Sequence, residues 1–184
     1  MRIVAGEWRG RNLVAPQGDT TRPTADRTRE TLFSMLVSRL GSFEGLEVAD
    51  LFAGSGALGL EALSRGAATC MFVEQDAPAI RALRQNIANL RAQPRCDVRA
   101  GSVLALGPAK QPLDLILLDP PYGTGAGAVA LDRLARHGWI GEATWVSLET
   151  AADEEPKVKA LEPVAERRVG KARLTLLRLT GAPG

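Results

Sequence analysis

Residues Val48–Gly59 read VADLFAGSGALG, an apolar run followed by a glycine-rich turn and then by small and apolar residues. Gly54, Gly56 and Gly59 match the pattern G-x-G-x-x-G, which permits a tight turn between a strand and a helix and a close approach of a ligand to the backbone. The stretch therefore predicts the first strand, glycine turn and helix of a nucleotide-binding α/β sheet.

The acidic residues around this turn bear on the cofactor. Glu74 ends a second expected strand, twenty residues after Gly54, and a carboxylate there can accept the hydroxyl groups of an adenosine ribose. The glycine pattern alone does not distinguish a dinucleotide from S-adenosylmethionine as the cofactor. Asp50 lies four residues before Gly54, where it would repel a pyrophosphate but can pair with a methionine ammonium group. S-adenosylmethionine is therefore the favoured cofactor.

A second motif, Asp119-Pro120-Pro121-Tyr122, follows the apolar run 113–118, which is typical of a buried parallel strand. The carboxyl end of such a strand is where open α/β sheets bind ligands. The Asp119 carboxylate and the Pro120 carbonyl can accept the hydrogens of a flat amine, and Tyr122 can stack on its ring. This combination predicts alkylation of a nucleobase amino group.

Alternation of strands and helices from residue 45 onwards predicts an α/β fold with parallel pairing. Helices are also predicted, the first with a core-facing stripe of Leu32, Phe33, Leu36, Val37 and Leu40. The expected strands are 47–52, 69–74, 96–100, 113–118 and 144–149, with an antiparallel pair at 161–168 and 172–179, and the expected helices are 25–40, 57–65, 77–91 and 127–137. Residues 2–15 are expected to form a hairpin around Trp8.

Composition favours one domain. The chain has 184 residues, 45% of them hydrophobic, and no apolar run approaches a membrane span or a signal peptide, so we expect a cytoplasmic protein without membrane contact. The two cysteines, Cys70 and Cys96, lack metal-site spacing and there is a single histidine, His137. We therefore expect free thiols and no metal.

Three motifs together resemble those of amino-methylating S-adenosylmethionine enzymes: residues 50–56, 72–76 and 114–122. The segments 2–11 and 21–33 narrow the resemblance to the bacterial 16S ribosomal RNA (guanine-N2)-methyltransferases that modify guanine 966, and the similarity covers essentially the whole chain. The resemblance implies a Rossmann-like, seven-stranded class I methyltransferase sheet with helices on both faces. It also implies a small hairpin extension over residues 1–20, in contact with RNA, and a catalytic core over 21–184.

The resemblance also implies roles for individual residues. The expected catalytic residues are Asp119, Pro120 and Tyr122, and the expected cofactor-binding residues are Asp50, Phe52, Ala53, Gly54, Ser55, Gly56, Glu74, Gln75, Ser102 and Val103. Many such enzymes carry an acidic or amide side chain after the third strand to contact adenine. This chain has Ser102 there, which would have to serve in its place.

The expected partner is 16S ribosomal RNA, within an assembling small subunit, bound by a monomer. The net charge is only +2, so phosphate attraction alone would be weak, and we expect bidentate arginine contacts from Arg9, Arg11, Arg22, Arg27 and Arg29. Two alternatives remain open from the sequence: a methyltransferase of DNA adenine N6 or cytosine N4, and a non-catalytic RNA-binding assembly factor. A DNA enzyme usually needs extra sequence to read bases in the major groove, and this chain has little to spare.

Overall fold

The computed structural model describes residues 1–16 and 23–182. Its helices are α1 (Pro23–Leu40), α2 (Ala57–Ser64), α3 (Ala77–Asn89) and α4 (Ala126–Arg136), with short 3-10 turns η1 (Gln93–Arg95) and η2 (Val103–Ala105). The strands are β1 (Glu47–Leu51), β2 (Thr69–Glu74), β3 (Cys96–Ala100), β4 (Leu115–Leu118), β5 (Trp145–Ala151), β6 (Leu161–Val169) and β7 (Ala172–Leu179).

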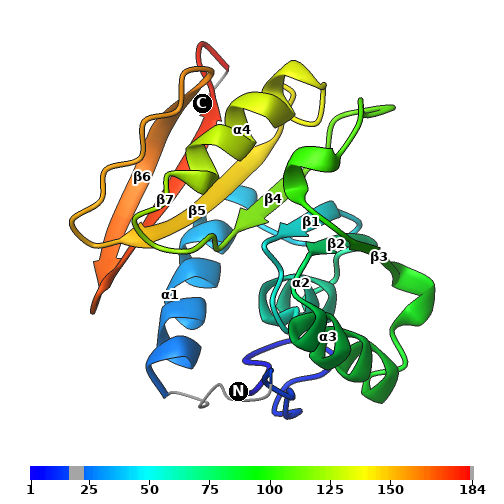
Figure 1. Cartoon of the computed structure of the whole chain (residues 1–184). Coiled ribbons are helices and arrows are strands. Elements are labelled where there is room, and N and C mark those ends of the chain that lie inside the picture. Colours follow the sequence, from blue (N-terminus) through cyan, green and yellow to red (C-terminus); the bar gives the residue numbers. More distant parts are fainter. Residues whose placement is uncertain (17–22, 183–184) are drawn as a thin grey trace.

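The strands form one seven-stranded sheet in the order β3-β2-β1-β4-β5-β7-β6 (Figure 1). The first five pair in parallel, whereas β7 runs antiparallel between β5 and β6. The predicted seven-stranded α/β sheet, including its antiparallel edge pair, is confirmed, and each predicted strand lies within two residues of the observed one. The order reverses at β1 and β4, so the ligand-binding crevice is expected at their carboxyl ends.

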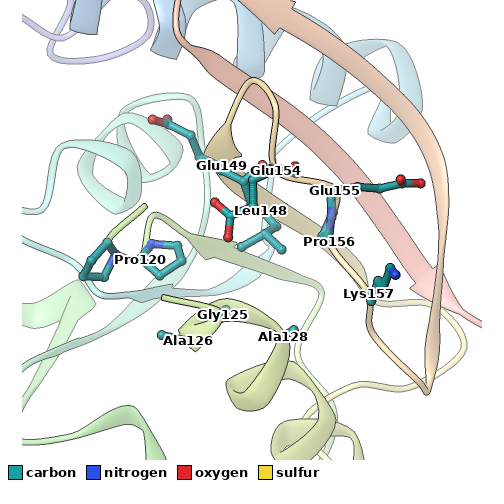
Figure 2. Close-up of a pocket in the computed structure, with 13 residues that line it drawn as sticks. Pro120, Gly125, Ala126, Ala128, Leu148, Glu149, Glu154, Glu155, Pro156 and Lys157 are labelled. Atoms are coloured by element: carbon teal, nitrogen blue, oxygen red, sulfur yellow. Dashed lines mark hydrogen bonds between the residues drawn. The ribbon is translucent and has the colours of Figure 1, made fainter. Parts of the chain in front are cut away.

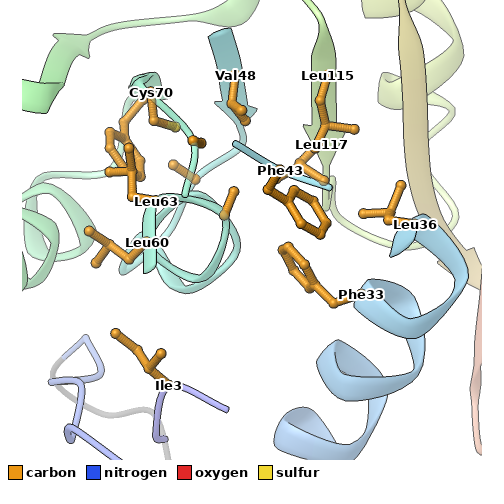
Figure 3. Packing of buried hydrophobic residues seen from close by; sticks show 14 of the residues in the cluster. Ile3, Phe33, Leu36, Phe43, Val48, Leu60, Leu63, Cys70, Leu115 and Leu117 are labelled. Carbon is orange, nitrogen blue, oxygen red and sulfur yellow. The ribbon is translucent and has the colours of Figure 1, made fainter. Parts of the chain in front are cut away.

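Helices cover both faces of the sheet, as expected. Residues of α1, α2 and α3 pack with Val48 and Leu117 on one face, in the core that Figure 3 shows around Phe33 and Phe43. On the other face α4 packs on Ile116 and Leu118, together with η2. Each fully buried large apolar side chain of these layers contributes about 1.5–3 kcal/mol relative to exposure. Among the described residues, no helix is both long and apolar enough to cross a membrane.

One expectation at the amino terminus is corrected. Residues 2–15 do not form two strands: a single antiparallel bridge joins Arg2 to Asn12, and the segment between them turns back over α2. Backbone hydrogen bonds join its two arms, from the Ile3 N–H to the Arg11 carbonyl (3.0 Å) and from the Gly10 N–H to the Ile3 carbonyl (2.8 Å). Glu61 of α2 also accepts the N–H groups of Val4 (2.9 Å) and Ala5 (3.1 Å).

The predicted stripe of α1 is correct for Leu32, Phe33 and Leu36, which are buried, and Leu40 is partly buried. Val37 is 40% exposed, since the helix turns this position away from the sheet.

Gly59 lies where α2 crosses β2. A Cβ atom added there would be 2.4 Å from Cε1 of Phe72 and 2.7 Å from Sγ of Cys70. Only a residue without a side chain allows the helix to approach the strand this closely.

We predict that Gly59→Ala lowers the free energy of unfolding by about 1–3 kcal/mol, because overpacking forces the helix and the aromatic ring apart. Urea unfolding measures the change. Gly107→Ala is the matched control, since a Cβ atom at Gly107 meets no atom within 4 Å. Equal stability of the two variants would contradict the packing role.

Candidate active site

A cleft of about 1030 Å³ opens at the carboxyl ends of the central strands. Its walls come from the loop after β1, the end of β2, the turn after β3 and the loop after β4. The lining includes these predicted site residues: Asp50, Phe52, Ala53, Gly54, Ser55, Glu74, Gln75, Ser102, Val103, Asp119, Pro120 and Tyr122. Three separate sequence motifs therefore meet in one cavity, whose volume suits a small-molecule ligand with part of a second one.

The glycine turn between β1 and α2 is held by Asp50. The first turn of α2 has no cap from its own Gly56, whose φ is +86°; instead, the buried Asp50 carboxylate accepts the N–H of Gly59 at 2.9 Å. A negative group here also complements the helix dipole. Phe52 has a φ of +58°, a conformation that non-glycine residues rarely adopt and that often marks functional sites.

Glu74 holds the other side of the turn. Its Oε1 accepts the N–H of Gly54 at 2.8 Å, and its Oε2 accepts the N–H groups of Gln75 and Asp76, each at 2.9 Å. Gly54 has a φ of +57° and faces open space in the cleft. A carboxylate oxygen has two lone pairs, so Oε1 retains one acceptor position that can point into the cleft.

Gly56 is the predicted cofactor-binding residue that the structure does not place in the lining. A Cβ atom there would lie 2.4 Å from Cδ1 of Leu83, so Gly56 serves the packing of α2 on α3. Ser102 lines the cleft, but its hydroxyl oxygen already accepts the N–H of Leu104 at 3.1 Å and caps η2.

The Asp119 motif forms the opposite wall. Asp119 follows β4 and remains open to the cleft, whereas Pro120 is buried. The Pro121 carbonyl accepts the Thr124 hydroxyl at 2.9 Å. In the hydrogen bonds found among the described residues, the Pro120 carbonyl accepts none, so its lone pairs are available to a ligand amine.

Tyr122 is 44% exposed, and its hydroxyl donates to Oε2 of Glu149 at 2.6 Å. Glu149, in β5, was not predicted. A strand-end acid on the neighbouring parallel strand was the available signal, but the sequence does not reveal which acid reaches the motif.

A smaller cavity of about 220 Å³ shares Pro120 and Pro121 with the cleft and is bounded by the start of α4 and by residues 154–157 (Figure 2). Figure 2 shows Leu148 turned toward this cavity and the Glu149 side chain turned away from it. Glu149 lies between the two spaces: it is among the residues around the smaller cavity and not among those that line the cleft, but its carboxylate bonds Tyr122 of the cleft.

The carboxyl groups of this region disfavour one another's ionisation. Partial exclusion of water by the surrounding protein, and then the Glu149 carboxylate, raise the pKa of Asp119. Burial likewise raises the pKa of Glu149 and of Asp50, the latter also through the charges of Asp119 and Glu74. The pKa of Tyr122 is raised, first by burial and then by its bond to Glu149, so the hydroxyl stays protonated. An acidic cleft of this kind disfavours a pyrophosphate and favours ligands that bring cations or hydrogen-bond donors.

Of the predicted RNA-binding arginines, the four that the structure describes do not line the cleft. Arg9, Arg11 and Arg27 are exposed, although Arg11 donates to the Asn89 carbonyl at 2.9 Å. Arg29 is 4% exposed and pairs with Asp26 (3.0 Å) and Glu61 (3.5 Å), so its guanidinium is not accessible to phosphate. Arg22 lies outside the described residues.

Trp8, for which the sequence left stacking on RNA or covering the domain open, is buried under Arg95, whose Cζ lies 5.3 Å from the ring centroid. It covers the domain. The described residues contain no group of three or more acidic, cysteine or histidine side chains arranged to hold a metal ion.

Comparison with known proteins adds the family. The model of the family described as conserved hypothetical protein 95 matches residues 1–178. The chain is 37% identical over 153 residues to ribosomal RNA small subunit methyltransferase D of Escherichia coli strain K12, covering 83% of this chain and 76% of that protein. It is also 37% identical over 162 residues to the protein of the same name from Haemophilus influenzae, covering 84% and 80%. The solved structure of Escherichia coli yhhF superposes with a TM-score of 0.83 at 33% identity, covering 97% of both chains.

We predict that Glu74→Ala weakens the affinity for S-adenosylmethionine at least about tenfold, because the ribose hydroxyls lose an acceptor and the Gly54 N–H loses its partner. Isothermal titration calorimetry measures the affinity. Glu155→Ala, which removes an exposed acid outside the cleft, is the control. Unchanged affinity in Glu74→Ala would exclude this residue from the cofactor site.

A pH dependence follows from the raised pKa of Asp119. Only the ionised carboxylate supplies the negative charge that stabilises the developing positive charge on the amine, so we predict that turnover at saturating cofactor falls as the pH drops through a value well above the pKa of an ordinary aspartate. In Glu149→Gln the neighbouring charge is absent, and the inflection of the pH–rate profile should move to lower pH. An inflection that does not move would show that Glu149 does not influence Asp119.

Proposed function

The chain belongs to the family described as conserved hypothetical protein 95, and from this premise we propose that it methylates the exocyclic N2 amine of a guanine in small-subunit ribosomal RNA, of the guanine-966 type, with S-adenosylmethionine as donor. The observation that carries the proposal is the shared cleft: the glycine turn and Glu74 form one wall and Asp119, Pro120 and Tyr122 form the other. The names of the relatives support methylation of ribosomal RNA over methylation of DNA and over a non-catalytic role.

The donor end of the cleft fits S-adenosylmethionine. The bound cofactor supplies an electrophilic methyl group on a sulfonium. Glu74 would accept the ribose hydroxyls, and Asp50, buried beside the glycine turn, would face the ammonium group. Gly54, with open space where a side chain would stand, lets the ligand approach the backbone.

The acceptor end would hold the guanine. Its amine is a weak nucleophile, because the nitrogen lone pair is delocalised into the ring. Asp119 and the Pro120 carbonyl accept its two hydrogens, which orients the lone pair and stabilises the positive charge that develops on nitrogen. The Asp119 carboxylate then takes the surplus proton or passes it to water. Tyr122 offers its ring, fixed through Glu149, as the surface on which the flipped base stacks.

The finer setting is part of the proposal. A net charge of +2 gives little general attraction to RNA, which favours a particle of RNA and ribosomal proteins as the substrate. The proposal includes that the protein acts on this particle as a monomer in the cytoplasm. Exposed Arg9, Arg11 and Arg27 are the candidate phosphate contacts among the described residues, with Arg22 outside them. The segment 1–20 would contact RNA, next to the core 21–184.

The test uses small-subunit particles from a strain that lacks this protein. Mass mapping of the RNA before and after adding wild-type protein and cofactor should show one new N2-methylguanine. Methylation of DNA instead, or no transfer to either nucleic acid, would refute the proposal.

We predict that Asp119→Ala lowers turnover on these particles at least about 100-fold, while the affinity for S-adenosylmethionine stays within about threefold of wild type. Radiolabel transfer and calorimetry measure the two quantities. Asp153→Ala, which removes an exposed aspartate from the loop after β5, is the matched control. A loss of cofactor affinity that accounts for the whole loss of rate would contradict the role of Asp119.

A further inference from the structure

Glu149 contacts the acceptor end of the cleft through Tyr122, and the mechanism above uses it only as a support for that ring. Its position follows from the register of the sheet. Leu117 of β4 pairs with Ser147 of β5, and two residues further along each strand come Asp119 and Glu149. β4 ends at Leu118, and continuing the alternation of faces by one residue puts Asp119 on the face of Glu149; the effect of the Glu149 charge on the pKa of Asp119 agrees with this proximity.

The contacts of Glu149 leave an acceptor available. Its Oε2 takes the Tyr122 hydroxyl at 2.6 Å, and no other donor to Glu149 is found among the described residues. Oε1 therefore has its lone pairs open. Oε2 bonds Tyr122, which lines the cleft, and the Glu149 charge raises the pKa of Asp119, so the carboxyl group of Glu149 lies close to both residues.

Two carboxylates side by side select for a particular edge of a base. In guanine the exocyclic amine at N2 lies next to N1–H, so two adjacent positions donate hydrogen bonds. In adenine the amine at N6 lies next to N1, and in cytosine the amine at N4 lies next to N3, and both ring nitrogens are acceptors. An ionised carboxylate facing such a nitrogen sets lone pair against lone pair and leaves a partly desolvated charge without a donor, which is strongly unfavourable.

We propose that Glu149 reads the N1–H of the target guanine while Asp119 holds its N2 amine, and that this pair of carboxylates gives the site its preference for guanine over adenine and cytosine. The inference rests on the proposed function and adds to it the residue that selects the base. Burial raises the pKa of both groups in the free protein, and a base edge with two donors favours the ionised form of each when it binds.

The competing explanation is that Glu149 acts only through Tyr122. Two substitutions distinguish direct reading of the base by Glu149 from support of Tyr122. Glu149→Gln keeps the size of the side chain and places an amide, which can donate, opposite N1. Tyr122→Phe removes the hydroxyl that bonds Glu149 and keeps the ring.

The experiment compares two small-subunit RNAs that carry either guanine or 2-aminopurine at the methylated position. The base is introduced by splinted ligation, and each RNA is used as the naked RNA or particle that the wild-type protein methylates. 2-Aminopurine keeps the N2 amine but has an acceptor at N1. For wild type we expect kcat/KM to favour guanine at least about 100-fold, and for Glu149→Gln we expect the ratio to fall to about tenfold or less. The loss of O6 in the analogue is common to all variants and cancels when their ratios are compared.

Binding provides a second readout. In the presence of S-adenosylhomocysteine, wild type should bind the RNA with guanine more tightly than the RNA with 2-aminopurine. In Glu149→Gln the ratio of these two affinities should be smaller, as the ratio of the kcat/KM values is. Tyr122→Phe should lower the rates on both bases and keep the wild-type ratio. Glu155→Gln, the control for an exposed acid, should keep both the ratio and the rates. Calorimetry with S-adenosylmethionine verifies that each variant is folded.

The inference would be overturned if Glu149→Gln kept the wild-type ratio of kcat/KM for guanine over 2-aminopurine. It would also be overturned if Tyr122→Phe lowered this ratio as much as Glu149→Gln does, because Glu149 would then act only by supporting the tyrosine. Either result leaves guanine methylation by the wild-type protein intact. Failure of the wild-type protein to methylate guanine at all refutes the proposed function instead.

Discussion

The glycine turn between β1 and α2 is held by two carboxylates from neighbouring strands, and the cleft depends on that constraint. Asp50 accepts the N–H of Gly59 and so replaces the side-chain cap that Gly56 cannot provide. Glu74 accepts the N–H of Gly54 from the other side. Backbone donors that a helix start leaves unpaired are thereby satisfied from outside the helix. The turn is fixed before any ligand arrives, which reduces the ordering that binding requires.

A second buried polar network joins the amino-terminal segment to this frame. Glu61 of α2, 0% exposed, accepts two backbone N–H groups of that segment and pairs with Arg29 and Arg65. Asn86 of α3 bonds both the N–H and the carbonyl of Val14 and also the Ser55 carbonyl of the glycine turn. Because Met1 and Pro16 line the cleft, this network makes the segment part of the cofactor wall as well as a cover for α2.

The strands, the glycine turn and the Asp119 motif were predictable because their signals are local. The four residues of β4 are all buried and apolar, and the positive φ of Gly54 and Gly56 is what glycine in such a turn implies. The failures concern partners distant in the sequence. Arg29 reads as a free cation until Glu61 is placed beside it by the docking of α1 on α2. Glu149 likewise could not be assigned to the site, because its partner Tyr122 lies 27 residues earlier. The pairing of β4 with β5 brings the two together, and no local sequence pattern encodes that pairing.

Four carboxyl groups, those of Asp50, Glu74, Asp119 and Glu149, converge on one edge of the sheet. Burial raises the pKa values of Asp50, Asp119 and Glu149, and the charges of neighbouring carboxylates add to this for Asp50 and Asp119, so the ionised forms are destabilised in the free protein. A ligand that brings an ammonium group to Asp50 and a base edge with two donors to Asp119 and Glu149 relieves this repulsion. Relief of this electrostatic destabilisation on binding therefore adds to the affinity for ligands that carry several hydrogen-bond donors. Phosphate-rich cofactors and bases with an acceptor beside the amine gain no such relief, so one electrostatic arrangement accounts for both the choice of cofactor and the choice of base.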